Sequence, residues 1–316
     1  MHLSNLISVL ADGEFHSGSE LGERFGVSRT AIWKALEGLE GLGLDYESHR
    51  GKGYRLLSPI DLLDKSKILN FVSDSHHADA QIEVVDTCAS TNTDVHSISA
   101  NLPYRVLFSE QQSAGRGRRG RDWVSPFGQN LYFSVCFEWF KGPAALQGLS
   151  IVVGIALAQV LKGLNVTDVG LKWPNDIWIS DKKAAGILIE LSGEATGSWL
   201  VTIGIGMNVS MSERQASQID QPWTAIAQHV DVERNELAGR LLESLLNNMS
   251  IFREKGFEAY VDEYGKFDAL KNRSVKVIGP DVEGVALGVD LQGGLQLKVD
   301  DGVKVFHSGE VSVRPI

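Results

Sequence analysis

Residues 106–137 read VLFSEQQSAGRGRRGRDWVSPFGQNLYFSVCF. Two apolar runs of strand length, Val106–Ser109 and Leu131–Phe137, enclose a loop that is rich in glycine and arginine. The loop formally matches the GxGxxG pattern, but dinucleotide binding requires such glycines to open a helix and an acidic residue about 20 positions later on a strand end. Residues 122–128, DWVSPFG, cannot continue as a helix, so hydride transfer is disfavoured.

The chemistry of this loop points to an anionic ligand. Between Gly115 and Arg121 the chain combines flexible backbone amides with four guanidinium groups. Bidentate donors at this density suit a polyphosphate, or a carboxylate next to a phosphate. We therefore expect the segment to order around such a ligand. The alternative is a solvated arginine cluster that touches RNA or DNA.

A second motif follows a strand-like run, where residues 171–177 read LKWPNDI. Pro174 fixes a turn that presents Asn175 and Asp176 at the edge of a strand, and Lys172 adds a cation. An adjacent amide and carboxylate can bind a divalent ion, a ribose or an amine. The alternative is an Asn-Asp turn that caps itself.

Short apolar strands alternate with helical material between residues 82 and 208. Besides the two strands already quoted they are Ile82–Val85, Gly186–Leu191 and Trp199–Ile205. This alternation predicts a mixed α/β domain built on an extended sheet. Lys183 lies on a turn that leads into one of these strands, and on its own it reads as a solvated lysine.

The length of 316 residues suits two or three domains. We expect an α/β multidomain chain with a winged helix-turn-helix at 1–62, a catalytic domain on a mixed sheet at 66–268, and a small SH3-like β-barrel at 269–316. A helical stretch at 62–71 and a polar link at 73–77 mark the first boundary. Alternating apolar and polar positions between glycines predict the final barrel.

The first sixty residues predict a helix-turn-helix. Leu3–Leu10 and Ser17–Phe25 read as helices, and Ser17 with Glu20 forms a capping box. Ser28 is a good N-cap for a third helix, whose apolar residues face inward. In this arrangement the second helix of the pair enters the major groove of DNA. The residues expected at the DNA are Ser28, Arg29, Thr30, Trp33 and Lys34, with Arg50 and Lys52 from the following hairpin.

That hairpin has the character of a wing. The strand-like runs 44–46 and 54–57 flank a tip whose cations suit phosphate. Residues 1–57 carry six basic and eight acidic residues, a net charge of −2, so one copy should bind DNA weakly. A dimer that presents two copies to a palindromic site would bind DNA more tightly than one copy. The alternative is a winged helix used for protein contact.

Composition limits the possible classes of protein. The net charge of −10 argues against broad nucleic-acid binding by the whole molecule. Cys88 and Cys136 are far apart in the chain, so neither a disulfide framework nor a metal site is predicted. Residues 1–15 lack the features of a secretory signal, and the apolar stretch Leu149–Leu164 is too short and interrupted for a bilayer. We expect a cytoplasmic protein without a membrane segment.

Taken together, five segments resemble the biotin protein ligase family in order and spacing. They are Ser90-Thr91-Asn92, residues 111–121, residues 172–176, Lys183 with Gly186, and residues 204–208, GIGMN. With the winged helix, the whole chain is similar to the bifunctional branch of that family, which combines a biotin operon repressor with a biotin–[acetyl-CoA-carboxylase] ligase. A monofunctional biotin ligase is the nearest rival, and a lipoate-type ligase normally lacks both the winged helix and the glycine-arginine run.

The resemblance implies a two-step reaction with biotin, ATP and Mg²⁺. Biotin's carboxylate attacks the α-phosphorus of ATP to give biotinyl-5'-AMP and pyrophosphate. A lysine of the biotin carboxyl carrier protein of acetyl-CoA carboxylase then attacks the acyl carbon. The cations of the two motifs would stabilise the negative charge that develops in both steps.

Roles for individual residues follow from the same resemblance. The implied catalytic residues are Lys183, Arg118 and Asp176. The implied biotin contacts are Ser90, Thr91, Asn92, Gln112, Arg116, Gly117, Arg118 and Lys183. The implied nucleotide contacts are Gly115, Arg119, Arg121, Trp123, Lys172, Asn175, Asp176 and Asn208. Trp123 would cover the intermediate and the adenine, and Lys183 would hold the biotin carboxylate against the α-phosphate.

The domain order also suggests regulation. Bound biotinyl-adenylate would favour a homodimer, so that two winged helices reach biotin operator DNA and repress biotin synthesis genes. This requires only that the adenylate bind the dimer-competent state better than the free state. The alternative function is a transcriptional regulator that senses biotin without significant ligase activity.

Overall fold

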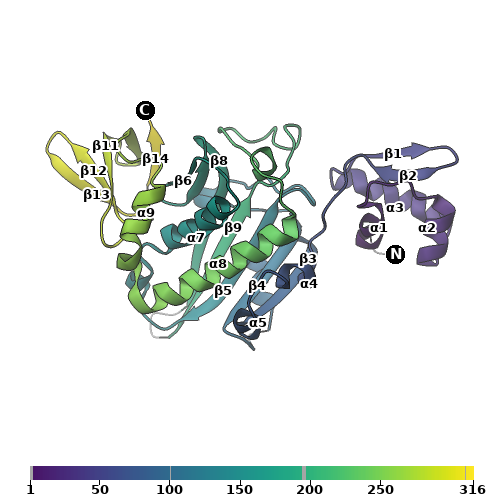
Figure 1. The fold of residues 1–316 in the computed structure, drawn as a ribbon, viewed down its shortest axis with the longest axis horizontal. Helices are drawn as coiled ribbons and strands as arrows, with labels where there is room; N and C mark the ends of the chain where they lie inside the picture. The colour runs from purple at the N-terminus through teal and green to yellow at the C-terminus, as the bar shows by residue number, and fades with distance from the viewer. Residues whose placement is uncertain (1–2, 100, 194–196, 310) are drawn as a thin grey trace.

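The computed structural model describes residues 3–99, 101–193, 197–309 and 311–316. Figure 1 shows three units in chain order: a winged helix at one end, a large sheet with its helices in the middle, and a small sheet at the other end. The predicted fold class is confirmed.

The N-terminal unit has three helices and a two-stranded wing. Its elements are α1 (Leu3–Leu10), α2 (Gly18–Phe25), α3 (Arg29–Gly41), β1 (Tyr46–His49) and β2 (Gly53–Leu56). The predicted capping box of Ser17 and Glu20 is present, and Ser28 accepts a hydrogen bond from the backbone N–H of Ala31. The first wing strand begins two residues later than the run predicted at 44–46, because Tyr46 pairs with Leu56.

The central unit is built on a mixed sheet in the order β3-β4-β5-β9-β8-β7-β6. The strands are β3 (Ala80–Cys88), β4 (Tyr104–Gln112), β5 (Leu131–Trp139), β6 (Val169–Lys172), β7 (Asp176–Ile179), β8 (Lys182–Gly193) and β9 (Trp199–Met207). Strands β3 and β4 are parallel, and the other pairs are antiparallel. Each strand predicted from the sequence lies within one of these strands.

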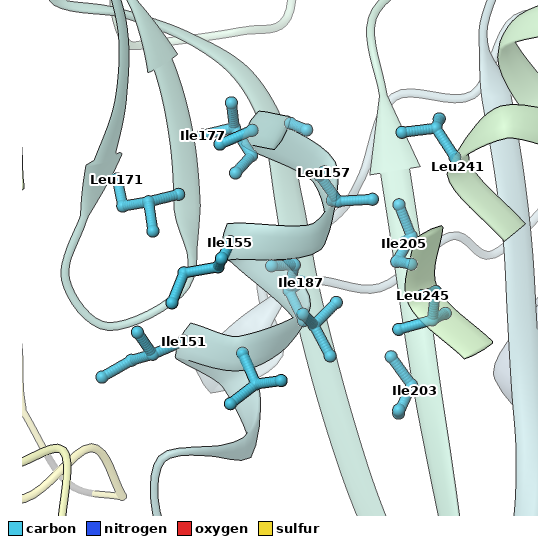
Figure 2. Packing of buried hydrophobic residues seen from close by; sticks show 14 of the residues in the cluster. Ile151, Ile155, Leu157, Leu171, Ile177, Ile187, Ile203, Ile205, Leu241 and Leu245 are labelled. Atoms are coloured by element: carbon cyan, nitrogen blue, oxygen red, sulfur yellow. The ribbon is translucent and has the colours of Figure 1, made fainter. Parts of the chain in front are cut away.

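Helices bury one face of this sheet. They are α7 (Leu149–Gly163), α8 (Arg234–Lys255) and α9 (Val261–Phe267), with the 3₁₀ turns η3 (Pro143–Leu146) and η5 (Phe257–Tyr260). Figure 2 shows leucine and isoleucine side chains of α7 and α8 gathered with Ile187 of β8 and with Ile203 and Ile205 of β9. Burial of these side chains is the main stabilising contribution in this unit.

One described helical stretch, Pro143–Gly163, is long and apolar enough to cross a membrane by length and composition alone. In the structure 61% of its apolar window is buried inside the protein. Helix α7 packs on α8 and on the sheet, which accounts for apolar residues all around it.

The structure also contains short helices, two of which differ from what the sequence predicted at the first domain boundary. They are α4 (Lys65–Leu69), α5 (Asp74–Asp79), α6 (Thr91–Asp94) and the 3₁₀ turns η1 (Val95–Ser97), η2 (Arg118–Gly120) and η4 (Ile226–Gln228). The expected polar link at 73–77 is wrong, since helix α5 occupies it. His76 lies 2.8 Å from Glu243 of α8, a tertiary contact that anchors this short helix. The helix expected at 62–71 is shorter, because Asp64 caps α4.

The C-terminal unit is a five-stranded antiparallel sheet in the order β13-β12-β11-β10-β14. Its strands are β10 (Ser274–Ile278), β11 (Val282–Val289), β12 (Leu295–Val299), β13 (Gly302–Phe306) and β14 (Ser312–Pro315). The indole Nε1 of Trp173 donates to the carbonyl of Gly293 at 2.9 Å and ties this sheet to the central unit. This antiparallel sheet is consistent with the small SH3-like β-barrel expected at the C-terminus.

The winged helix joins the central unit through buried contacts. Phe127, which follows the glycine-arginine loop, is 2% exposed and belongs to the hydrophobic cluster of the winged helix. In the central unit, Arg234 of α8 forms a buried ion pair with Glu110 of β4 at 2.7 Å. Arg234 also donates to the carbonyl of Asp61, and Glu110 accepts from the backbone of Leu63. The linker backbone is therefore held by the central unit.

Candidate active site

A cavity opens on the sheet face opposite α7 and α8. It measures about 1010 Å³ including its open mouth. Among the residues that line it, fourteen were predicted as site residues: Ser90, Thr91, Asn92, Gln112, Arg116, Gly117, Arg118, Arg119, Arg121, Trp123, Lys172, Asn175, Asp176 and Lys183. They come from separate segments, so the fold brings together motifs that the sequence keeps up to 93 positions apart.

The floor of the cavity is a hydrogen-bonded polar group. Thr91 donates from its backbone N–H and its hydroxyl to Gln112 Oε1, at 2.9 and 3.1 Å. Ser134 Oγ lies 2.8 Å from Thr91 Oγ1 and 2.6 Å from Asn92 Oδ1. Gln112 Nε2 donates to Ser125 Oγ at 3.1 Å. Because their partners are fixed, these side chains are pre-oriented for a polar ligand.

Glycines in β8 and β9 make room for two side chains on the sheet. A Cβ at Gly204 would lie 2.1 Å from Asn92 Oδ1, and one at Gly206 would lie 2.4 Å from Trp123 Cε2. At Gly186 the distance to the Trp123 ring would be 2.9 Å. Side chains at these positions would collide, so Trp123 can lie against the strands only because glycine occupies them. The Trp123 Nε1 is buried and lacks a hydrogen-bond partner within the described part of the chain.

The glycine-arginine loop closes on itself beside this floor. Gly117 N–H donates to the carbonyl of Arg121 at 2.7 Å, and Trp123 N–H donates to the carbonyl of Gly115 at 2.9 Å. Arg119 takes a left-handed backbone conformation, with φ 59°. Its Nη1 lies 3.4 Å from Ser312 Oγ of the C-terminal sheet. Residues 122–128, which were expected not to form a helix, form none, and the 3₁₀ turn η2 lies before them at Arg118–Gly120.

A cluster of charges stands at one wall. Asp176 Oδ1 lies 2.8 Å from Lys183 Nζ, and Asp176 Oδ2 lies 3.5 Å from Lys172 Nζ. The Lys183 ammonium also lies 5.4 Å from the centre of the Trp123 ring. Arg118 Nη1 donates to Asn175 Oδ1 at 3.1 Å, and Arg118 Nη2 donates to the carbonyl of Ser308. Arg118 and Lys183 thus contact Asn175 and Asp176, two adjacent residues of the 172–176 motif, within one cavity.

Burial sets the electrostatics of this wall. Desolvation lowers the pKa of Lys172 below its ordinary value, and the carboxylate of Asp176 opposes part of that shift. Desolvation likewise lowers the pKa of the Arg118 guanidinium, again opposed by Asp176. Three cations share one buried carboxylate, which leaves positive potential for an anionic ligand.

Two predicted residues lie outside the cavity lining. Gly115 is buried at the base of the loop, where a Cβ would lie 2.6 Å from the carbonyl oxygen of Trp123. Asn208 donates to the carbonyls of Lys183 and Thr224, at 3.3 and 3.2 Å. It borders an adjoining hollow that it shares with Arg121, Trp123 and Trp223. Their nucleotide contacts remain predictions.

Sequence reasoning missed several residues of the site. Ser134 and Glu190 hold the floor, and Gln221, Ser312 and Val313 line the cavity. The sequence could have indicated Ser134 and Glu190, because each is a polar residue within an apolar strand run. Ser312 and Val313 had no such signal, since only the packing of the C-terminal sheet brings them here.

The residues expected at DNA all lie on the surface of the winged helix. Arg29, Thr30, Trp33 and Lys34 are exposed on α3, and Trp33 is 50% exposed despite its size. Ser28 is exposed at the start of that helix, and Arg50 and Lys52 are exposed at the tip of the wing.

Comparisons with known proteins agree with this layout. Residues 82–208 match the Biotin/lipoate A/B protein ligase family, residues 2–55 match the HTH domain, and residues 272–314 match the Biotin protein ligase C terminal domain. The Bifunctional ligase/repressor BirA of Salmonella typhimurium and that of Escherichia coli are each 41% identical over 313 residues, covering 98% of this chain and 96% of the relative.

Among solved structures, the biotin protein ligase from Aquifex aeolicus in complex with biotin and ATP superimposes with a TM-score of 0.62 at 29% identity. That match covers 75% of this chain and 99% of the other. Given the full-length identity, the order of the three units and the cavity they form, the chain belongs to the family of the bifunctional ligase/repressor BirA.

Proposed function

We propose that this chain is an ATP-dependent biotin protein ligase and a DNA-binding repressor. The observation that carries the enzymatic part is the convergence of Arg118, Lys172 and Lys183 around Asp176 at one wall of the cavity. The substrates are biotin and ATP, with Mg²⁺ bound to the nucleotide. Mg²⁺ usually needs one or two carboxylates besides phosphate and water, and Asp122 and Asp176 line the cavity.

In the first step a carboxylate oxygen of biotin attacks the α-phosphorus, and the bond to pyrophosphate breaks. Two anions must approach each other for this to happen. We infer that the Lys183 ammonium, which contacts Asp176, lies between the carboxylate and the α-phosphate, and that the Arg118 guanidinium, which contacts Asn175, offers bidentate donors to them. Their positive charges stabilise the charge that develops on the phosphate oxygens.

In the second step the amine of a carrier-protein lysine attacks the acyl carbon, and AMP leaves. The loop from Gly115 to Trp123 shields the adenylate from water until the acceptor arrives. We infer that Ser90, Thr91, Asn92, Gln112, Arg116 and Gly117 contact biotin. We infer that Gly115, Arg119, Arg121, Trp123, Lys172, Asn175 and Asn208 face the nucleotide. Asp176 orients Lys183 and Lys172 through the two ion pairs.

The experiment combines pure protein with biotin, ATP, Mg²⁺ and a biotin carboxyl carrier domain, followed by a probe for covalent biotin. Biotin on the carrier lysine supports the proposal. A protein that binds biotin and ATP without labelling the carrier would instead be a sensor, the alternative function. The Lys183 ammonium, held by Asp176, favours the ligase, because it is available to stabilise charge that develops on the phosphate oxygens in the transition state.

Repression rests on the winged helix. Its exposed cations on α3 and at the wing tip fit the major groove and the flanking phosphates of a biotin operator. We propose that the adenylate-bound form dimerises and so presents two such modules. Gel-shift assays should therefore show tighter operator binding with biotin and ATP than without them. Equal affinity in both conditions would remove the corepressor role and leave the ligase proposal standing.

A further inference from the structure

The floor of the cavity and the glycine-arginine loop meet at one carboxylate. Glu190 of β8 accepts a hydrogen bond from Asn92 Nδ2 at 2.7 Å. The same oxygen, Oε2, accepts from Arg116 Nη2 at 3.2 Å. Asn92 follows β3 on helix α6, and Arg116 belongs to the loop. Glu190 therefore joins three segments that are distant in the sequence.

The contact with Asn92 continues into the floor. Asn92 is 4% exposed, and its Oδ1 lies 2.6 Å from the buried hydroxyl of Ser134. Ser134 in turn lies 2.8 Å from Thr91 Oγ1, and Thr91 donates to Gln112 Oε1. A chain of hydrogen bonds thus runs from the carboxylate to residues proposed to bind biotin. When every member of a buried polar network is satisfied, the network is rigid.

The two bonds to Glu190 differ in strength. The bond from Asn92 is partly buried and charge-assisted, so it holds firmly. The Arg116 and Glu190 side chains are 48% and 41% exposed, and ion pairs this open contribute little by themselves. Arg116 also donates to Thr93 Oγ1 at 3.2 Å. Asn92 is therefore the stronger partner of Glu190, and the bond to Arg116 can break while the bond to Asn92 stays.

We propose that Glu190 is a positioning residue that fixes the biotin pocket through Asn92 and gives the glycine-arginine loop a second, weaker contact with that pocket through Arg116. This inference rests on the proposed ligase function and adds a residue that determines affinity for biotin. Glu190 acts through Asn92 and Arg116 and is outside the cavity lining, to which Lys183 and Asp176 belong. Its loss lowers affinity for biotin in the ground state and the transition state alike, so KM for biotin rises while kcat stays.

The test uses the full chain and compares Glu190→Ala with Glu190→Gln in the ligation assay. Glu190→Ala removes both bonds, and we expect its KM for biotin to rise roughly tenfold or more, as for the loss of a hydrogen bond to a charged group. Glutamine keeps an oxygen for Asn92 and loses the charge that attracts Arg116, so Glu190→Gln should fall between wild type and Glu190→Ala. It also keeps the side-chain shape if Glu190→Ala proves unstable.

The matched control is Glu83→Gln, an exposed glutamate on β3 of the same sheet and outside the cavity lining. We expect its constants to equal those of wild type, and KM for ATP and kcat of the Glu190 variants to stay within about twofold of wild type. The inference is overturned if both variants keep the wild-type KM for biotin, or if kcat and the melting temperature fall without a change in that KM. Absence of ligation by the wild type would instead reject the proposed function.

Discussion

The winged helix and the cavity are built in opposite ways. The helices and wing of the first lie within residues 3–56, with caps and apolar spacing that neighbouring residues supply. The cavity takes its lining from segments between Ser90 and Val313, in two of the three units. A locally specified module keeps its form when distant residues change, whereas a cavity assembled from remote segments depends on each of them.

The largest effect is expected when one cation is removed from the charge cluster of the cavity. Lys183→Met removes the ammonium that lies 2.8 Å from Asp176. We expect kcat for ligation to fall roughly 10²- to 10³-fold, the usual loss when one transition-state donor is removed. The measurement is steady-state transfer of biotin to a carrier domain.

Its control is Lys182→Met, the exposed neighbour on the same strand and outside the cavity lining. That variant should keep wild-type rates. Similar losses in both variants would show that the strand, and not the ammonium, matters.

The second prediction tests how far the stability of the winged helix depends on residues outside its own segment. Among the described residues, its buried cluster receives Phe127 from beyond residue 62. Phe127→Ala should destabilise the winged helix by about 3 kcal/mol through a lost aromatic ring and the cavity left behind. Denaturant unfolding reports the change. Phe140→Ala is the control, since that ring is 78% exposed, and an unchanged midpoint for Phe127→Ala would show that the module is independent of it.

A smaller effect concerns a purely local feature. Ser17→Ala removes the side chain that accepts from Glu20 N–H in the capping box. We expect a loss of about 1 kcal/mol in stability, measured by urea unfolding, with biotin ligation unaltered. Ser19→Ala, at an exposed position inside α2, is the comparison. A change in ligation kinetics would contradict the separation of the two regions.

The smallest effect is on the pH profile of the cavity. Burial lowers the pKa of Lys172 below its ordinary 10.5, so this ammonium loses its proton as pH rises while ordinary lysines keep theirs. Affinity for ATP should therefore fall on the alkaline side, before the usual lysine range. Lys172→Arg should move that fall to higher pH, because guanidinium stays protonated. With Lys182→Arg the profile should not move, and a Lys172→Arg profile equal to wild type would contradict the assignment.

Much of the fold was predictable because it depends on local chemistry. The caps at Ser17 and Ser28 and the apolar runs of the strands are short-range signals, and all appear where expected except the first wing strand, which begins two residues later. Helix α5 was missed because the hydrogen bond between His76 and Glu243, a contact across 167 positions, anchors a polar segment. The site residues came from the resemblance to a family, and composition alone left Lys183 as a solvated lysine.

The order of caps, apolar periods and turns along the chain determined by itself that a winged helix precedes a mixed sheet and a small β-unit, since these signals act between near neighbours. Tertiary structure decided which polar groups meet: that Lys172 and Lys183 share Asp176, that Glu190 reaches Asn92 and Arg116, and that Phe127 enters the winged helix. Such encounters depend on the register of the strands and the burial of the sheet, which no short stretch of sequence contains.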